Sequence, residues 1–148
     1  MRSFTAKALS ARIDDRVLYE DVNVHLEPGD VVSVRGPSGS GKTTLLRQLA
    51  WLTPADGRLT LDGKGPAEWG IPTWRTRVTY VAQSPPPFSG TSNQFLELIS
   101  SLKCRRHARS PHDIADQWGV SEKRWTQRWS ELSGGERQRI YLAIAIAG

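Results

Sequence analysis

The sequence predicts an α/β fold, and two features of the first half of the chain lead to this prediction. A β-branched run at residues 31–34 leads directly into a glycine-rich loop that begins at Gly36. Beyond the loop, leucines recur at helical spacing between Lys42 and Leu52, as expected of one face of a helix. The order is therefore strand, loop, helix, which is a building unit of α/β folds.

Length and composition favour one globular domain. The chain has 148 residues, of which 38% are hydrophobic and 24% are charged, as in ordinary soluble globular proteins. It contains no run of ~18 apolar residues, which a membrane span would need, and no signal-peptide pattern at its start. The net charge of +5 suits nucleic acid, anionic lipid or a polyanionic ligand such as ATP, and does not choose among them.

Further strands follow from alternation and turn residues. Apolar residues alternate with polar ones over 17–26, which predicts a half-buried strand. A short strand is predicted at 58–61 between two Asp-Gly turns, and another at 78–82. The three prolines at 85–87 form a rigid connector that cannot be helical, so we expect the clearest boundary inside the chain there.

Helical spacing returns after the proline connector. Apolar residues predict a helical insertion from about Thr91 to Ser130. The helix expected after Glu136 carries apolar residues nearly all round, which is normal for a buried helix and implies either missing neighbours or a tightly enclosed position. The expected parts of the chain are a P-loop core with a β portion at 1–84, a helical subdomain at 85–130, and a second glycine motif with its following helix at 131–148.

The glycine-rich loop satisfies the GxxxxGK[ST] motif with a predicted strand before it and a helix after it. Its backbone N–H groups can turn toward phosphate oxygens, and the helix N-terminus adds a favourable dipole. Lys42 would reach the β- and γ-phosphates, the Thr43 hydroxyl would ligate Mg²⁺, and Thr44 would touch a phosphate. The alternative is a glycine turn that binds nothing, which this context disfavours. The loop residues are Gly36, Pro37, Ser38, Gly39, Ser40, Gly41, Lys42 and Thr43.

The second glycine motif is Leu132–Glu136, called the signature motif below. Ser133 and the backbone of Gly134 and Gly135 can approach a γ-phosphate closely, because a helix begins just after them. Glu136 also stands at the capping-box position relative to Ser133. A phosphate contact and a capped helix start are compatible interpretations.

The P-loop, Gln83 at the end of the 78–82 segment, and the signature motif occur in the order and approximate spacing of the ATP-binding subunit of ABC transporters, which the chain resembles. Within that family, residues 81–91 most resemble bacterial iron-export ATPases. The resemblance implies a P-loop NTPase core of the ABC type, with an N-terminal antiparallel β portion and a helical subdomain.

The resemblance also implies a site and partners. ATP would lie between the P-loop of one subunit and Ser133, Gly134 and Gly135 of a second subunit in a head-to-tail dimer. Gln83 would contact Mg²⁺ and position the attacking water. A transmembrane permease subunit would be the other partner, which places the chain in the cytoplasm, on the inner face of the cell membrane.

The sequence departs from the family pattern in three respects. No aromatic residue stands at 10–13 to stack on adenine, and Tyr19 lies too close to the next strand to replace one. Ile144 stands where the family often has arginine. The Walker B aspartate, the catalytic glutamate and the switch histidine do not follow the signature motif, so we expect a chain incomplete at its C-terminus with very slow hydrolysis alone.

Two other functions stay open beside an ATP-binding transport subunit. One is a nonhydrolytic nucleotide-binding or regulatory fragment. The other is a soluble ABC protein that acts on nucleic acid, which only the charge favours and which we consider the less favoured alternative. The basic run at 103–109 is expected to be a solvated helix face, and the tryptophans at 118, 125 and 129 are expected to pack in a core or against a partner.

Overall fold

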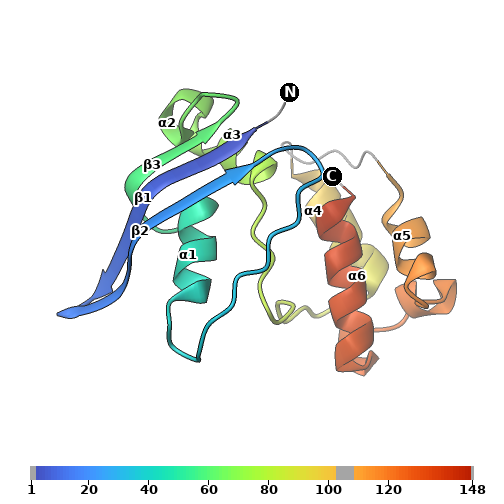
Figure 1. Ribbon diagram of the computed structural model, residues 1–148. Coiled ribbons are helices and arrows are strands. Elements are labelled where there is room, and N and C mark those ends of the chain that lie inside the picture. The colour runs from blue at the N-terminus through green and yellow to red at the C-terminus, as the bar shows by residue number, and fades with distance from the viewer. Residues whose placement is uncertain (1–2, 103–108, 148) are drawn as a thin grey trace. The chain divides into compact units, whose positions relative to one another are not determined.

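The computed structural model describes residues 3–102 and 109–147 (Figure 1). The chain divides into two compact units, Met1–Tyr80 and Val81–Gly148. No helix among the described residues is long and apolar enough to cross a membrane. Most of the basic run, from Lys103 to His107, lies outside the described residues, whereas the backbone N–H of Arg109 donates to the carbonyl of Ala147 at 3.1 Å.

The first unit contains an antiparallel sheet of three strands in the order β2-β1-β3. The strands are β1 (Phe4–Ile13), β2 (Arg16–Leu26) and β3 (Asp56–Leu61) (Figure 1). Phe4 pairs with Leu26 on one side and with Leu61 on the other. The strands predicted at 17–26 and 58–61 are therefore confirmed, and the antiparallel β portion with them.

Helices cover one face of this sheet and close a small core. They are α1 (Lys42–Leu49), α2 (Pro66–Trp69) and α3 (Ile71–Arg77). Trp74 is fully buried, and its indole Nε1 donates to the carbonyl of Leu49 at 3.1 Å. This bond joins α3 to the end of α1 and so helps to fix the helix that follows the P-loop. The core residues are Ala6, Leu9, Leu45, Leu59, Leu61 and Trp74.

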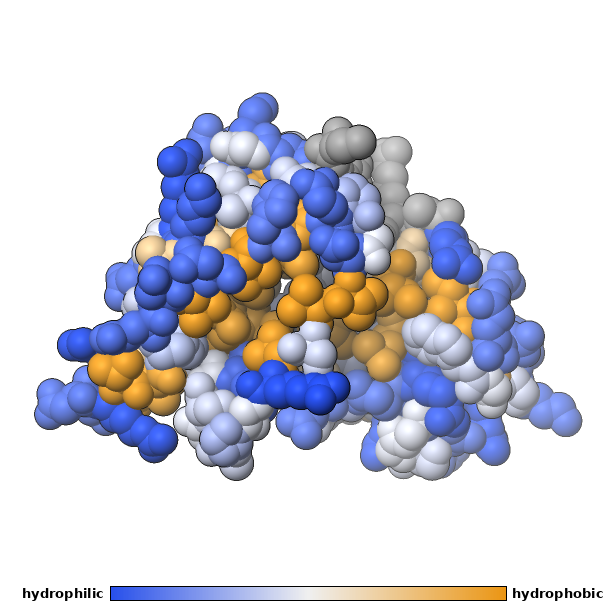
Figure 2. All heavy atoms as spheres, in the orientation of Figure 1, coloured by the Kyte–Doolittle hydropathy of each residue, from blue (hydrophilic) through white to orange (hydrophobic). Residues whose placement is uncertain are grey.

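The strands predicted at 31–34 and 78–82 are not formed, which corrects the expected order of strand, loop and helix. Val31 is 94% exposed and Val32 57%, and Figure 2 shows hydrophobic residues uncovered on the face that it draws. A strand needs a neighbour to satisfy its backbone N–H and C=O groups. Among the described residues no strand pairs with either segment, so both remain without regular structure.

The second unit is helical, as predicted. Its α-helices are α4 (Ser92–Ser101), α5 (Pro111–Gln117) and α6 (Gly134–Ile146), and two short 3₁₀ turns, η1 (Glu122–Trp125) and η2 (Trp129–Glu131), lie between α5 and α6. The fold class, α/β with an antiparallel sheet and a helical part, is therefore confirmed.

Tryptophans form much of the core of this unit. Trp125 is 0% exposed and Trp129 2%, so their expected role in core packing is confirmed. Trp118 is 39% exposed. Ile146 at the end of α6 is 52% exposed, so among the described residues this apolar helix is only partly covered, which agrees with missing neighbours rather than with a tightly enclosed position. The buried face of α6 consists of Ile140, Ala143, Ile144 and, just beyond the helix, Ala147.

Candidate functional site

The helix that follows the P-loop begins without a side-chain cap. Gly41 occupies the N-cap position with φ 90° and ψ 8°, no side chain accepts a hydrogen bond from the first turn, and that turn contains no acidic residue. The first N–H groups of a helix have no partner within the helix, and they carry the positive end of its dipole. The start of α1 is therefore suited to bind an anion.

Glycine is required at position 41 for two reasons. The left-handed backbone conformation disfavours any residue with a Cβ atom, and a Cβ placed there would lie 3.0 Å from both Leu18 Cβ and the ring of Tyr19. The N-terminus of α1 thus lies close against β2. This packing leaves no room for a larger residue at the last glycine of the loop.

Lys42 is already turned toward the loop. Its Nζ donates to the carbonyl oxygens of Gly36 at 2.8 Å and Pro37 at 2.7 Å. An ammonium group has three hydrogens, so one remains for another acceptor. The loop closes with a bond of 3.3 Å from the backbone N–H of Ser40 to the carbonyl of Pro37. The structure therefore brings a positive charge and an uncapped helix start to the same short loop.

The remaining predicted P-loop residues lie on this loop and the first turn of α1. Ser38 and Gly39 are exposed at its tip, and Gly39 has a positive φ of 74°. The side chain of Thr43 is exposed, and that of Thr44 is half-buried. Both threonines stand in the first helical turn, where a hydroxyl group can reach a ligand held by the neighbouring N–H groups.

The signature motif forms the capped start of α6. Ser133 Oγ accepts a hydrogen bond from the backbone N–H of Glu136 at 3.2 Å, and the backbone N–H of Ser133 donates to Glu136 Oε2 at 3.0 Å. This reciprocal pair is the capping box expected from the sequence, which is confirmed. Because Ser133 Oγ accepts here, its own hydrogen is left to donate to another group.

Gly134 has no role in the fold that would require glycine. A Cβ atom at this position would meet nothing within 4 Å, and its φ is not positive. Glycine in a helix destabilises it by roughly 0.5–1 kcal/mol relative to alanine. A close approach by another backbone or a ligand would account for glycine at this exposed position.

The carboxylate of Glu136 is stabilised in its charged form. The hydrogen bond from the Ser133 backbone, aided by the nearby charges of Arg124 and Arg139, holds the pKa of Glu136 below its ordinary value. Arg124 Nε lies 2.8 Å from Glu136 Oε1 in an ion pair. The first turn of α6 is therefore fixed by contacts outside the signature motif as well as within it.

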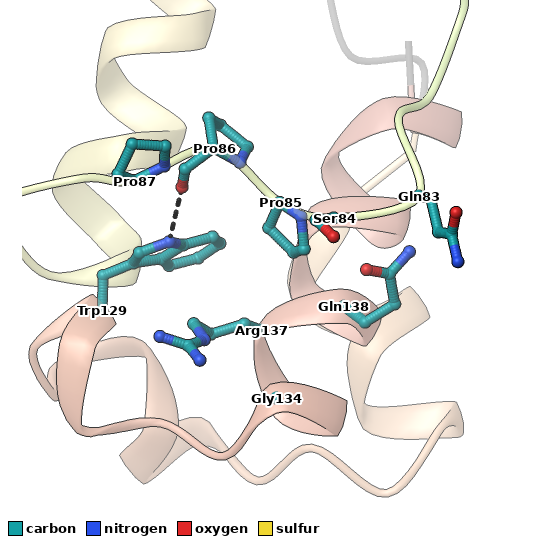
Figure 3. A pocket seen from close by; sticks show the side chains of 9 residues that line it. All are labelled: Gln83, Ser84, Pro85, Pro86, Pro87, Trp129, Gly134, Arg137 and Gln138. Atoms are coloured by element: carbon teal, nitrogen blue, oxygen red, sulfur yellow. Dashed lines mark hydrogen bonds between the residues drawn. The ribbon is translucent and has the colours of Figure 1, made fainter. Parts of the chain in front are cut away.

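Gln83 is exposed and lines a cleft of about 480 Å³ in the second unit (Figure 3). Trp129 lies toward the other end of this cleft, where its Nε1 donates to the carbonyl of Pro86 at 3.0 Å. Arg137 and Gln138 of α6 lie between them (Figure 3). The structure thus brings Gln83 and Gly134 to one cleft. The full lining is Gln83, Ser84, Pro85, Pro86, Pro87, Trp129, Gly134, Arg137 and Gln138.

Tyr19 is occupied by packing within the first unit. Its hydroxyl donates to Gln48 Oε1 at 2.8 Å, and burial raises the pKa of the phenol. Gln48, which is 5% exposed, also donates from Nε2 to the carbonyls of Ser10 and Pro54. Gln48 therefore supports α1 against the sheet, a role that the sequence does not predict because a single glutamine inside an apolar helical pattern carries no signal.

The P-loop, the uncapped helix behind it and the capped glycine motif define a P-loop nucleotide-binding protein. The sequence pattern of the ABC transporter family matches residues 19–148. The chain belongs to this family.

Individual relatives agree with this assignment. The chain is 35% identical over 131 residues to the "Putative ABC transporter ATP-binding protein YjkB" of Bacillus subtilis. This alignment covers 88% of this chain and 52% of that protein. It is 33% identical over 132 residues to the "Probable iron export ATP-binding protein FetA" of Escherichia coli, with 86% and 58% covered. The chain thus spans about half the length of the relatives it matches.

Solved structures share the fold. A structure described as the ATP-binding subunit of an ABC transporter superposes with a TM-score of 0.77 over 95% of this chain and 60% of that chain, at 21% identity. A bacterial Atm1-family ABC exporter with ATP bound gives the same TM-score over 98% of this chain and 27% of that chain, at 23% identity. At these identities the likeness extends to the fold alone.

Proposed function

We propose that the chain is the ATP-binding part of an ABC transporter subunit, in which bound ATP is coupled to movement of a solute through a membrane permease. One observation carries the proposal. The N-terminus of α1 has no side-chain cap and no acidic residue, and Lys42 Nζ lies against the same loop. This combination fits a polyphosphate, which supplies the negative charge that the helix start lacks.

The other loop residues have assigned roles in this proposal. The N–H groups of the loop and of the first turn of α1, except at Pro37, which has none, would hold the phosphates. The hydroxyl of Thr43 would ligate Mg²⁺, and Gln83 is proposed as a further Mg²⁺ ligand from the family resemblance alone. Mg²⁺ would neutralise charge on the transferred phosphate. Gln83 would orient water, but a carboxamide is not a base, so hydrolysis by these residues alone would be slow.

The signature motif would serve the ATP of a second subunit in a head-to-tail dimer. Ser133 retains a hydroxyl hydrogen to donate, Gly134 leaves open space beside it, and the start of α6 adds its dipole. The cleft beside Gln83, lined by prolines and Trp129, is the surface that we propose for contact with the permease. The subunit would then lie on the cytoplasmic face of the membrane.

The test is equilibrium binding of ATP with and without Mg²⁺. Replacement of Lys42 by alanine removes a charge-assisted contact of about 1.5–3 kcal/mol, so we expect binding about 10- to 100-fold weaker. Lys7→Ala is the matched control, because Lys7 is exposed on β1 and its side chain shares no hydrogen bond or ion pair with other described residues.

A further variant distinguishes the binding of Mg²⁺ from the binding of the phosphates. Thr43→Ala is expected to reduce the gain in affinity that Mg²⁺ gives while leaving Mg²⁺-free binding within about twofold. If Lys42→Ala binds ATP as tightly as the parent chain and Lys7→Ala, the proposed site is wrong.

A further inference from the structure

The arginine of η1 makes a contact that the signature motif itself does not contain. Arg124 Nε lies 2.8 Å from Glu136 Oε1, while the second oxygen of the same carboxylate, Oε2, accepts from the Ser133 backbone N–H at 3.0 Å. The side chain of Glu136 is 17% exposed and that of Arg124 41%. The carboxylate therefore connects η1 directly to the residue that begins the signature helix.

Arg124 is itself held in place. One of its terminal nitrogens donates to Gln127 Oε1 at 2.9 Å, and its backbone carbonyl accepts from the hydroxyl of Ser92 at 3.4 Å. Ser92 is fully buried on α4. The next residue, Trp125, is also fully buried. Arg124 thus extends from a backbone position that the core fixes.

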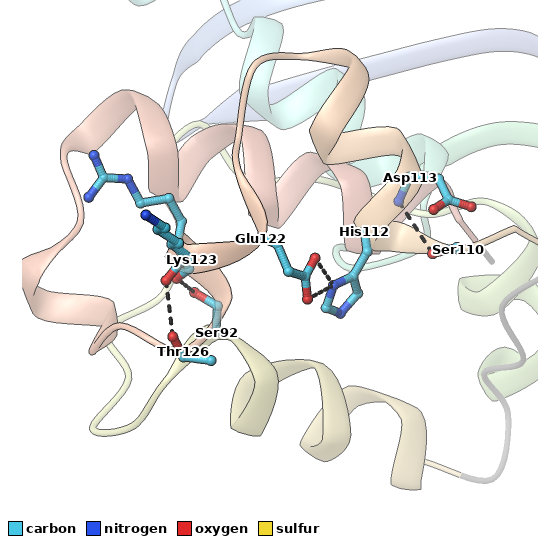
Figure 4. Close-up of polar contacts among 8 residues, drawn as sticks. Ser92, Ser110, His112, Asp113, Glu122, Lys123 and Thr126 are labelled. Atoms are coloured by element: carbon cyan, nitrogen blue, oxygen red, sulfur yellow. Dashed lines mark hydrogen bonds and ion pairs between the residues drawn. The ribbon is translucent and has the colours of Figure 1, made fainter.

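The rest of η1 is anchored to α5 (Figure 4). The ring of His112 stacks on Trp125 with centroids 3.9 Å apart and planes 13° from parallel. His112 Nδ1 also lies 3.1 Å from both carboxylate oxygens of Glu122. Because α4 and α5 both hold η1, the backbone of Arg124 is fixed, and from this position its guanidinium reaches Glu136.

We propose that Arg124 is a positioning residue for the signature motif: through Glu136 it fixes the orientation of Ser133 toward the ATP of the second subunit. A site is held precisely only when the residues behind it are themselves fixed. Without Arg124 the Glu136 carboxylate can turn away, and the hydrogen bond that orients Ser133 weakens. Charge-assisted bonds from arginine are directional, so lysine replaces this contact only in part.

This inference rests on the proposed head-to-tail dimer, so the experiment is dimer formation by the full chain with MgATP, followed by sedimentation. We expect Arg124→Gln to weaken ATP-dependent dimerisation about tenfold, as for loss of one partly exposed charge-assisted bond, and Arg124→Lys to weaken it less. Arg128→Gln, an exposed arginine on the same connection between α5 and α6, is the matched control and should dimerise as the parent chain does.

Two readouts separate positioning from a purely structural role. ATP binding to the monomer measures the P-loop of the same chain, and it should be unchanged in Arg124→Gln. In a Glu136→Gln background, Arg124→Gln should have little further effect, since the pair acts as a unit.

The outcomes are distinguishable. If the parent chain binds ATP and dimerises with MgATP but Arg124→Gln dimerises equally well, Arg124 has no positioning role. If Arg124→Gln loses monomer ATP binding or melts far below Arg128→Gln, its role is structural. If the parent chain does not dimerise with MgATP at all, the proposed dimer fails and this inference fails with it.

Discussion

Trp129 ties the segment that follows Gln83 to the helical core, and replacing it by phenylalanine tests that role. The indole Nε1 donates to the carbonyl of Pro86 at 3.0 Å. The ring packs against Phe95 with centroids 4.9 Å apart, and the residue is 2% exposed. Trp129→Phe keeps an aromatic ring, so the loss consists of one hydrogen bond and part of the ring volume.

The expected cost follows from these two contributions. A lost hydrogen bond costs about 1 kcal/mol, and the unfilled volume about 1–2 kcal/mol more. We therefore expect the free energy of unfolding to fall by about 2–3 kcal/mol, measured by urea denaturation followed by circular dichroism. Trp118→Phe is the matched control, because Trp118 is 39% exposed, and it should change the free energy by less than about 0.5 kcal/mol.

One result of this comparison would contradict the anchoring role of Trp129. If Trp129→Phe and Trp118→Phe lower the free energy of unfolding equally, Trp129 does not anchor the proline segment. The cleft beside Gln83 would then lack the support that the structure assigns to it.

Three other predictions concern individual side chains. The pKa of Glu136 is lowered from its ordinary value of 4.5. Its contribution to the free energy of unfolding is therefore complete above that pH and is lost as the pH falls through the lower native value. The free energy of unfolding should fall more steeply with acid in the parent chain than in Glu136→Gln, and equal slopes would contradict this. Tyr19→Phe leaves the buried Oε1 of Gln48 without its donor, so the free energy of unfolding should fall by about 1–2 kcal/mol, and no loss in urea denaturation would contradict the assigned bond. Gly134→Ala should leave the free energy of unfolding unchanged or up to ~1 kcal/mol higher, yet weaken dimerisation with MgATP; loss of stability would show that glycine serves the fold.

The two phosphate motifs could be predicted because their chemistry is local. The left-handed backbone of Gly41 and the serine cap at 133 depend on neighbours within four residues, although the packing of Gly41 against Leu18 and Tyr19 does not. Such short-range patterns are visible in a sequence. The helices behind them follow from apolar spacing for the same reason. The capping role of Glu136 was predictable on the same grounds.

The strands were harder to predict, because strand formation depends on distant partners. The valines at 31–34 have strong strand propensity, but no described strand pairs with them, so propensity alone misleads. The strand β1, in contrast, forms although the sequence does not predict it. Its inward residues include Ala6 and Leu9, and the bulge at Ala8, with φ 53°, shifts the alternation between them, so no period of two appears in the sequence.

Contacts across the fold could not be predicted at all. Nothing in the sequence pairs Arg124 with Glu136, because the ion pair depends on how η1 is anchored to α4 and α5. Gln48 is similar, since its three hydrogen bonds reach β1, β2 and the connection between α1 and β3. Support around a site is set by tertiary packing, which a single sequence does not display.

The central claim is that the start of α1 and its loop bind the phosphates of ATP, and backbone amide NMR on addition of ligand tests it most directly. We expect MgATP to shift the amide signals of Gly39, Gly41, Lys42 and Thr43, because their N–H groups acquire phosphate acceptors. Adenosine, which has no phosphate, should leave these signals in place. Equal shifts with adenosine and MgATP, or none with either, would contradict the claim.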